Sequence, residues 1–109
     1  MDCLFDKIAT GQIKSDVVYQ DETVMAFKDI HPKAPVHILI IPKKHIASLA
    51  EVSKEDLPLI AHMIEVANQV AKEQKTGNGY KLVINTGKLG GQVIMHLHMH
   101  LLGGKQLEE

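Results

Sequence analysis

The stretch HLHMHLL at residues 96–102 decides the fold, because it joins a strand pattern to a concentration of histidine. Its three histidines alternate with Leu97, Met99 and Leu101, and successive side chains of a β-strand point to opposite faces. We therefore expect one face that packs apolar side chains under a helix and one face lined by imidazoles. The chain has seven histidines, two Phe, two Tyr and no Trp, so histidine is where we look for chemistry.

Four other runs and the strand just described predict a five-stranded sheet. Residues 17–20 and 24–28 are rich in β-formers and flank a short polar stretch, which predicts a hairpin. Residues 37–41 are nearly all apolar, which is typical of a strand covered on both faces. Residues 81–85 predict a fourth strand, and the histidine strand extends from about 94 to 102.

One long helix is predicted between Ser53 and Gln74, where apolar residues recur with helical spacing. Ser53 followed by Asp56 resembles a capping box, although Pro58 moves the expected start toward Asp56 because proline suits only the first turn. Gly77 is the expected stop at the C-terminal end.

A short helix is predicted at the start, where Leu4, Phe5 and Ile8 share one face and Gly11 follows. Since short turns join the first strands and only one long helix occurs, we predict an α+β fold. It has an antiparallel sheet of five strands, with one long and one short helix on one of its faces. We treat residues 1–109 as a single domain.

Composition excludes several functional classes. Twelve basic and thirteen acidic residues give a formal net charge of −1 without charge runs, so we expect neither nucleic-acid nor membrane-surface binding. The lone Cys3 excludes an intrachain disulfide, and no stretch approaches the roughly 20 apolar residues of a membrane span. Acid near the N-terminus is unlike a signal peptide, and we expect a cytoplasmic protein.

The histidine row itself favours catalysis over metal binding. A single histidine in a strand is more often structural, but three in phase opposite an apolar set are unusual. His96 and His100 would lie roughly 13 Å apart along a strand, too far for all three to bind one zinc. A chance polar face, or two histidines sharing a metal, are the alternatives. Neutral imidazole is both a nucleophile and a proton carrier, so the row predicts an active site.

These residues resemble the histidine triad superfamily, whose signature is His-x-His-x-His-x-x with apolar residues at each x. The likeness is strongest to its branch of histidine triad nucleotide-binding proteins. It extends from about Leu4 to Lys105 through residues 27–30, 34–37, 41–45, 90–92 and 102–104. The resemblance implies an α+β chain that forms a homodimer with a continuous sheet. It also implies a purine nucleoside phosphoramidase that acts on adenosine 5′-monophosphoramidate and related adenylates.

The resemblance also implies residue roles. His98 is the expected nucleophile and forms a nucleotidyl-histidine intermediate, while His96 and His100 orient it, contact phosphate and deliver a proton to the leaving amine. A neutral nucleophile beside a protonated neighbour predicts a rate that falls at acid pH. His37 matches a histidine close to the triad and is expected to support it.

For the nucleotide, the resemblance assigns the ribose hydroxyls to Asp29 and the ribose-phosphate to Asn85. Asp29 has an alternative interpretation as a plain turn residue. The phosphate is expected on the flexible stretch that precedes the triad, at Gly91, Gln92, Val93 and Ile94. The base is expected in an apolar slot built from Leu4, Phe5, Ile8, Phe27, Ile30 and Leu39, which periodicity alone would place in the core.

Three features depart from the family pattern. Val93 stands where many relatives have a polar residue, which leaves the rate open. The longer C-terminal tail of the family is absent, which leaves the preference for the leaving amine open. Some relatives hold zinc through Cys-x-x-Cys and two histidines; here Cys3 and Asp6 occupy the pair, with His45 and His96 as the histidines. Because one cysteine is missing, we predict no metal and no cofactor, and we interpret His31, His45 and His62 as surface or loop residues.

Other functions stay open from sequence. The chain would be a nucleotide-binding adaptor with incidental catalysis if it bound nucleoside monophosphates without turnover. A dinucleotide hydrolase or nucleotidylyl transferase of the same superfamily is a further alternative, because fold and triad do not fix the leaving group. A metal-dependent hydrolase is the third. The choice between adenine and guanine is not predicted.

Overall fold

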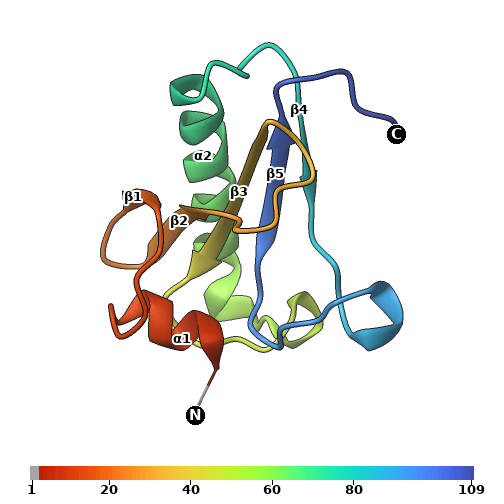
Figure 1. Ribbon diagram of the computed structural model, residues 1–109. Coiled ribbons are helices and arrows are strands. Elements are labelled where there is room, and N and C mark those ends of the chain that lie inside the picture. The colour runs from red at the N-terminus through yellow and green to blue at the C-terminus, as the bar shows by residue number, and fades with distance from the viewer. Residues whose placement is uncertain (1–2) are drawn as a thin grey trace.

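The computed structural model describes residues 3–109, and its sheet agrees with the predicted α+β fold. Figure 1 shows the long helix α2 lying along the sheet, with the short helix α1 near one end of the strands. Three single-turn 3₁₀ helices lie in the connections. The main elements are α1 (Leu4–Ala9), β1 (Val17–Gln20), β2 (Val24–Lys28), β3 (Val36–Pro42), α2 (Leu57–Glu73), β4 (Tyr80–Val83) and β5 (Met99–Gly103).

The five strands are antiparallel and follow the order β1-β2-β3-β5-β4. β3 is therefore central, and β5, which carries the end of the histidine row, pairs with it. Leu39 lies opposite His100, and His37 lies opposite Leu102. This register brings His37 and His100 to neighbouring positions on one face, because paired strands alternate in step.

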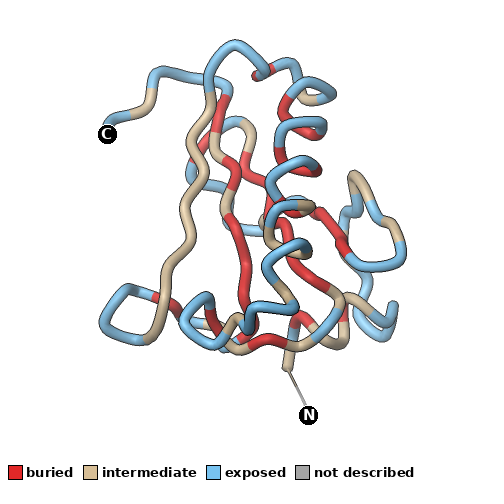
Figure 2. Tube along the Cα trace, turned by 180° about the vertical axis from the view of Figure 1, so that it is seen from behind, coloured by how far each residue is buried: buried red, intermediate tan, exposed pale blue. Residues whose placement is uncertain are grey.

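The sheet is covered on both faces, by a different helix on each. Ile38 and Ile40 of β3 pack with the buried face of α2, whereas Leu39 and Ile41 pack with Phe5 of α1. The expectation that both helices share one face is therefore wrong. Alternation along a strand whose residues are nearly all apolar does not reveal which helix covers which face. In Figure 2, β3 is buried over most of its length, while the edge strand β4 is only half-buried.

The long helix begins next to Asp56, as Pro58 predicted, but its cap and its C-terminal end differ from prediction. It starts at Leu57 with Pro58 in its first turn, and Ser53 only begins the preceding 3₁₀ turn, so the expected capping box does not cap the helix. At the other end Lys75, not Gly77, adopts the left-handed conformation, with φ of 63°. The amide of Thr76 bonds to the carbonyl of Ala71 at 2.8 Å, which is a Schellman ending with lysine in the usual glycine position.

The last strand is shorter than predicted. Regular pairing begins at Met99 rather than near Ile94, so His96, which lies in a bend, and His98 precede β5 and stand outside its ladder. Leu97, Met99 and Leu101 are all buried beneath α2, so the predicted alternation holds even where the ladder does not. Within residues 3–109 no helix is long and apolar enough to cross a membrane.

Candidate active site

The three triad histidines lie on the face of the sheet that α1 covers. Phe5 of α1 contacts two of them edge-on, with ring centroids 5.1 Å from His98 and 6.0 Å from His96. The rings of His98 and His100 are 5.1 Å apart. His96 and His98 are buried, and His100 is partly exposed. The structure therefore brings the three predicted residues together, with α1 as the cover of the row.

A backbone carbonyl fixes the protonated nitrogen of His98. Nδ1 of His98 lies 2.7 Å from the carbonyl oxygen of His96. A carbonyl oxygen can only accept a hydrogen bond, so Nδ1 must carry the proton. In the neutral ring the lone pair is then on Nε2, and this nitrogen is the one able to attack an electrophile.

His96 is held differently from its neighbours in the row. Its Nε2 donates to the carbonyl of Pro42 at 2.8 Å, and its side chain is fully buried. Burial lowers the pKa of this ring, although Pro42 and Asp6 oppose the shift. The lone pair of neutral His96 is therefore on Nδ1, on the side of the ring where α1 begins.

A chain of hydrogen bonds fixes the proton of His100. The backbone amide of Lys33 donates to Nδ1 of His37 at 3.0 Å, so the proton of neutral His37 is on Nε2. This Nε2 lies 3.0 Å from Nδ1 of His100 and donates to it. The proton of neutral His100 must then be on its Nε2. The resemblance placed His37 close to the triad, and in the structure His37 contacts His100.

Burial keeps this pair of rings neutral near pH 7. It lowers the pKa of His37, against the attraction of the Asp29 carboxylate. It also lowers the pKa of His100 to about 4, with His98 and His37 adding to the shift. Removing a cationic ring from water costs free energy, so the uncharged form is favoured. In the absence of ligand, His37 and His100 are therefore neutral at physiological pH.

Asp29 both shapes a turn and faces the histidines. One oxygen, Oδ1, accepts the backbone amide of His31 at 2.8 Å, which is the turn interpretation considered from sequence. The other, Oδ2, lies 3.4 Å from Nε2 of His37. The turn role of Asp29 therefore uses only one of its two oxygens.

The loop before the triad is held by the buried side chain of Gln92. Its amide nitrogen donates to the carbonyls of Ala47 and Ile94, and its Oε1 accepts the backbone amide of Gly87. All polar atoms of Gln92 are therefore engaged in shaping the loop. Gly91 has φ of 89° beside the Asn85 side chain, a conformation that favours glycine.

The side chain of Val93 is almost fully exposed, at 88%. As a valine, it offers no polar side-chain atom there.

The structure divides the predicted apolar slot for the base. Leu4 is 43% exposed and Ile30 84% exposed, so these two are free to contact a ligand. The other members are closed into the core between α1 and the sheet: Phe5, Ile8, Phe27 and Leu39.

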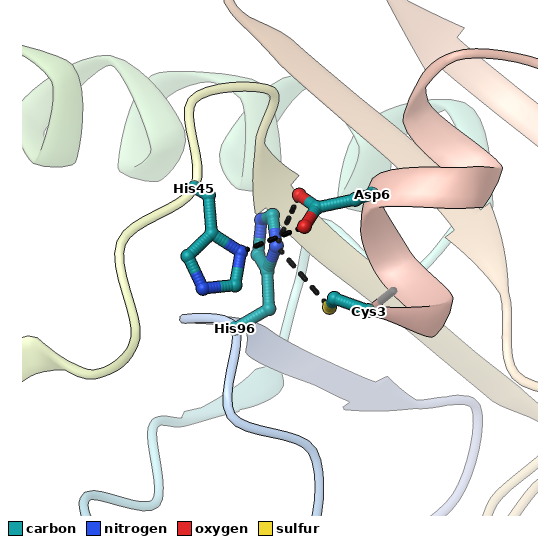
Figure 3. A group of neighbouring side chains, drawn as sticks. All are labelled: Cys3, Asp6, His45 and His96. Atoms are coloured by element: carbon teal, nitrogen blue, oxygen red, sulfur yellow. Dashed lines mark hydrogen bonds and ion pairs between the residues drawn. The ribbon is translucent and has the colours of Figure 1, made fainter. Parts of the chain in front are cut away.

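A second cluster adjoins the triad, at the four positions that match the zinc ligands of relatives. His45, interpreted as a loop residue, points its Nδ1 inward, 2.9 Å from Oδ2 of Asp6. The other oxygen of Asp6 lies 3.1 Å from Nδ1 of His96, and Cys3 completes the group (Figure 3). The only sequence signal was the partial match of these four positions to the zinc ligands of relatives.

Comparisons with known proteins agree with this geometry. A family model described as "Scavenger mRNA decapping enzyme C-term binding" matches residues 2–108. The chain is 48% identical to the purine nucleoside phosphoramidase of Escherichia coli K12 over 105 residues, covering 95% of this chain and 88% of that protein. It is 46% identical to the 14 kDa zinc-binding protein of Zea mays, covering 95% and 83%.

Among solved structures, a HIT family hydrolase from Legionella pneumophila Philadelphia 1 superimposes with a TM-score of 0.96 at 46% identity. The match covers 98% of this chain and 96% of that one.

Proposed function

The chain belongs to the histidine triad family, and we propose that it hydrolyses the P–N bond of purine nucleoside 5′-phosphoramidates. The products would be a nucleoside monophosphate and an amine. The observation that carries the proposal is the fixed tautomer of His98, whose Nε2 is left with a free lone pair next to two further histidines. Similarity to a protein named purine nucleoside phosphoramidase supports the substrate class.

The reaction has two displacements at phosphorus. In the first, Nε2 of His98 attacks, a P–Nε2 bond forms, the P–N bond of the substrate breaks, and the amine leaves with an added proton. In the second, water attacks phosphorus, the P–Nε2 bond breaks, and the proton lost by water returns to the protein. The covalent intermediate divides one difficult step into two easier ones.

We assign the proton donor for the amine to His100. Its Nε2 carries the proton, whereas Nε2 of His96 is engaged with the carbonyl of Pro42. Bound phosphoramidate is an anion, and a nearby negative charge favours the protonated form of an imidazole. Substrate binding would therefore favour a charged His100 at the moment when a proton is needed; its Nδ1 then also carries a proton, so the hydrogen bond between His37 and His100 would reverse.

For binding, we propose that Asp29 accepts the ribose hydroxyls and that Asn85 and the loop of Gly91 to Ile94 hold the phosphate. Backbone amides near a glycine can approach phosphate oxygens closely. In this scheme Gln92 acts by shaping the loop, because its own polar atoms are engaged. Leu4 and Ile30 supply the exposed apolar contacts for the base.

We further propose a cytoplasmic homodimer. Within residues 3–109, β4 lies at the edge of the sheet and pairs only with β5, so its outer backbone groups are available to a second copy. Pairing across this edge would make the continuous sheet expected from the resemblance. The molecular mass in solution, measured by light scattering, tests this point; a monomer at micromolar concentration would contradict it.

The deciding experiment is steady-state hydrolysis of adenosine 5′-phosphoramidate by the purified protein in the presence of EDTA. We expect turnover by the wild type and a loss of roughly 10³-fold or more in His98→Ala, because no other group replaces the nucleophile. His31→Ala, which changes an exposed histidine outside the triad, should lose far less. An inert wild type would overturn the proposal.

The exposed Val93 favours one second candidate, a nucleotide-binding adaptor with little turnover. That function predicts micromolar binding of AMP by a protein that does not hydrolyse the phosphoramidate. If so, Val93→Ser would place a polar group near the leaving amine. A gain in the rate of hydrolysis would then show that Val93 limits turnover. Loss of hydrolysis only when EDTA is present would instead indicate the metal-dependent alternative.

A further inference from the structure

A groove on the α1 face of the sheet adjoins the apolar slot proposed for the base. It has a volume of about 330 Å³ and lies between the C-terminal end of α1, the loop that follows and β1. Ile8, a member of the slot, and the buried Met25 of β2 line it. Ile13 and Val17 line it as well, and their side chains are 39% and 38% exposed. The groove therefore extends the slot beyond Ile8 with further apolar surface.

The proposed placement of the nucleotide directs its base toward this groove. The triad lies in and just before β5, and Asp29, which would accept the ribose hydroxyls, directly follows β2. Because the strand order is β1-β2-β3-β5-β4, the path from the triad to Asp29 leads toward β1. The backbone amide of Lys28 bonds to the carbonyl of Asp16 at 2.9 Å, which holds the chain before β1 beside the end of β2. A base joined to the ribose on the side away from the phosphate therefore meets the groove.

Two polar side chains of the groove present hydrogen-bond donors. Lys14 lines it and forms no ion pair within residues 3–109, where the lysines that do so are Lys28 and Lys44. The side-chain oxygen of Gln20 accepts a hydrogen bond from Lys43 at 3.3 Å, so its amide N–H groups are the part left for a ligand. An ammonium group has three N–H donors and no acceptor. An occupant with acceptor atoms at its edge would therefore suit both side chains.

Donors at this position distinguish the two kinds of purine. Guanine, like hypoxanthine, presents the neighbouring acceptors N7 and O6, whereas adenine has the acceptor N7 beside a donor amino group. One ammonium can donate to N7 and O6 together, but it has no acceptor for the adenine amino group. We therefore propose that Lys14 selects 6-oxopurines, so that the preferred substrates are phosphoramidates of guanosine and inosine. This inference rests on the proposed function and answers the choice of base that the sequence left open.

Calorimetric titration of the full chain with GMP, IMP and AMP, in the presence of EDTA, tests the inference without turnover. We expect GMP and IMP to bind about five- to tenfold more tightly than AMP, the lower end of the discrimination that a paired contact to N7 and O6 provides. Lys14→Met keeps an unbranched side chain but removes the ammonium, so the three affinities should converge. Lys14→Arg restores donors and should keep the preference. The matched control Lys54→Met, at an exposed position in the turn before α2, should bind like the wild type.

Ile13→Ala tests whether the base lies in the groove. Loss of apolar contact should weaken the binding of GMP and AMP by a similar factor, roughly threefold, and leave their ratio unchanged. Equal affinities of the wild type for GMP and AMP, a preference that survives in Lys14→Met, or no effect of Ile13→Ala would overturn the inference. The proposed function, measured by hydrolysis of the adenosine substrate, would then still stand. If none of the three nucleotides binds, both fail together.

Discussion

A backbone carbonyl decides which nitrogen of His98 is able to react. The carbonyl of His96 holds the proton on Nδ1, and the attacking nitrogen is thereby Nε2. His100 has the opposite tautomer, because His37 donates a hydrogen bond to its Nδ1 and the proton of His100 is therefore on Nε2. Two histidines separated by one residue thus present different groups, one a lone pair and the other a proton.

We expect His37 to affect catalysis through the hydrogen bond that it donates to His100. His37→Leu removes the donor, so His100 can adopt the other tautomer, and we expect kcat for phosphoramidate hydrolysis to fall by about tenfold with little change in KM. His37→Gln places an amide N–H near the original Nε2 and should recover most of the rate. If leucine and glutamine behave alike, His37 fills space and does not position His100.

At the scale of elements, an ion pair connects α2 to the turn between β1 and β2. Nε2 of His62 lies 2.7 Å from Oδ2 of Asp21, which also accepts the Tyr19 hydroxyl. Hydrogen bonding to Asp21, and then to Glu65, raises the pKa of His62. Burial alone would raise the pKa of Asp21, but hydrogen bonds from Tyr19 and His62 hold it well below its usual range.

These shifts predict how stability depends on pH. A raised histidine pKa stabilises the fold below the ordinary value of about 6.5, and this contribution is lost as pH rises through the folded-state value. A lowered aspartate pKa contributes above about pH 4 and is lost on acidification. The pair should therefore contribute most near pH 5–6, by no more than about 1 kcal/mol because His62 is one-third exposed.

The difference in Tm between the wild type and His62→Asn should be largest near pH 5–6 and should shrink above neutrality. His31→Asn is the matched control, because His31 is exposed and forms no ion pair within residues 3–109. A difference that is constant with pH would show that His62 acts through packing instead.

At the scale of the whole molecule, one face of the sheet packs against α2 and the other face carries the triad histidines. Met63 of α2 is fully buried on one face, whereas Phe5 on the other face packs against Phe27 and touches His96 and His98. The central strand β3 contributes to both cores with alternate residues. Substitutions on the two faces should therefore have different consequences.

We expect Met63→Ala to reduce the free energy of unfolding by about 2–4 kcal/mol through the cavity that it leaves. The kcat/KM of the molecules that stay folded should be unchanged. Phe5→Ala should cost a similar free energy of unfolding but also lower kcat/KM, because α1 would no longer cover the histidines. Urea unfolding and hydrolysis assays on the same samples check both; equal losses of kcat/KM would contradict the separation of faces.

Local patterns predicted most elements of the sheet. The runs 17–20 and 24–28 form β1 and β2 with the predicted bounds, because a polar turn marks where each must end. The final strand was predicted too long, since alternation records which side chains are buried and not which backbone groups pair. The end of α2 was misplaced because lysine, not glycine, takes the left-handed position there.

The spacing of residues 96–102 determined by itself that three imidazoles share one side of an extended segment, because side-chain direction in such a chain alternates from residue to residue. The tertiary structure decided what each imidazole does. The carbonyls of Pro42 and His96 and the ring of His37 set the tautomers. The approach of α1 to the loop after β3 placed Asp6 between two histidines. Hydrogen bonds and ion pairs join residues that are distant in sequence, so only the folded chain fixes them.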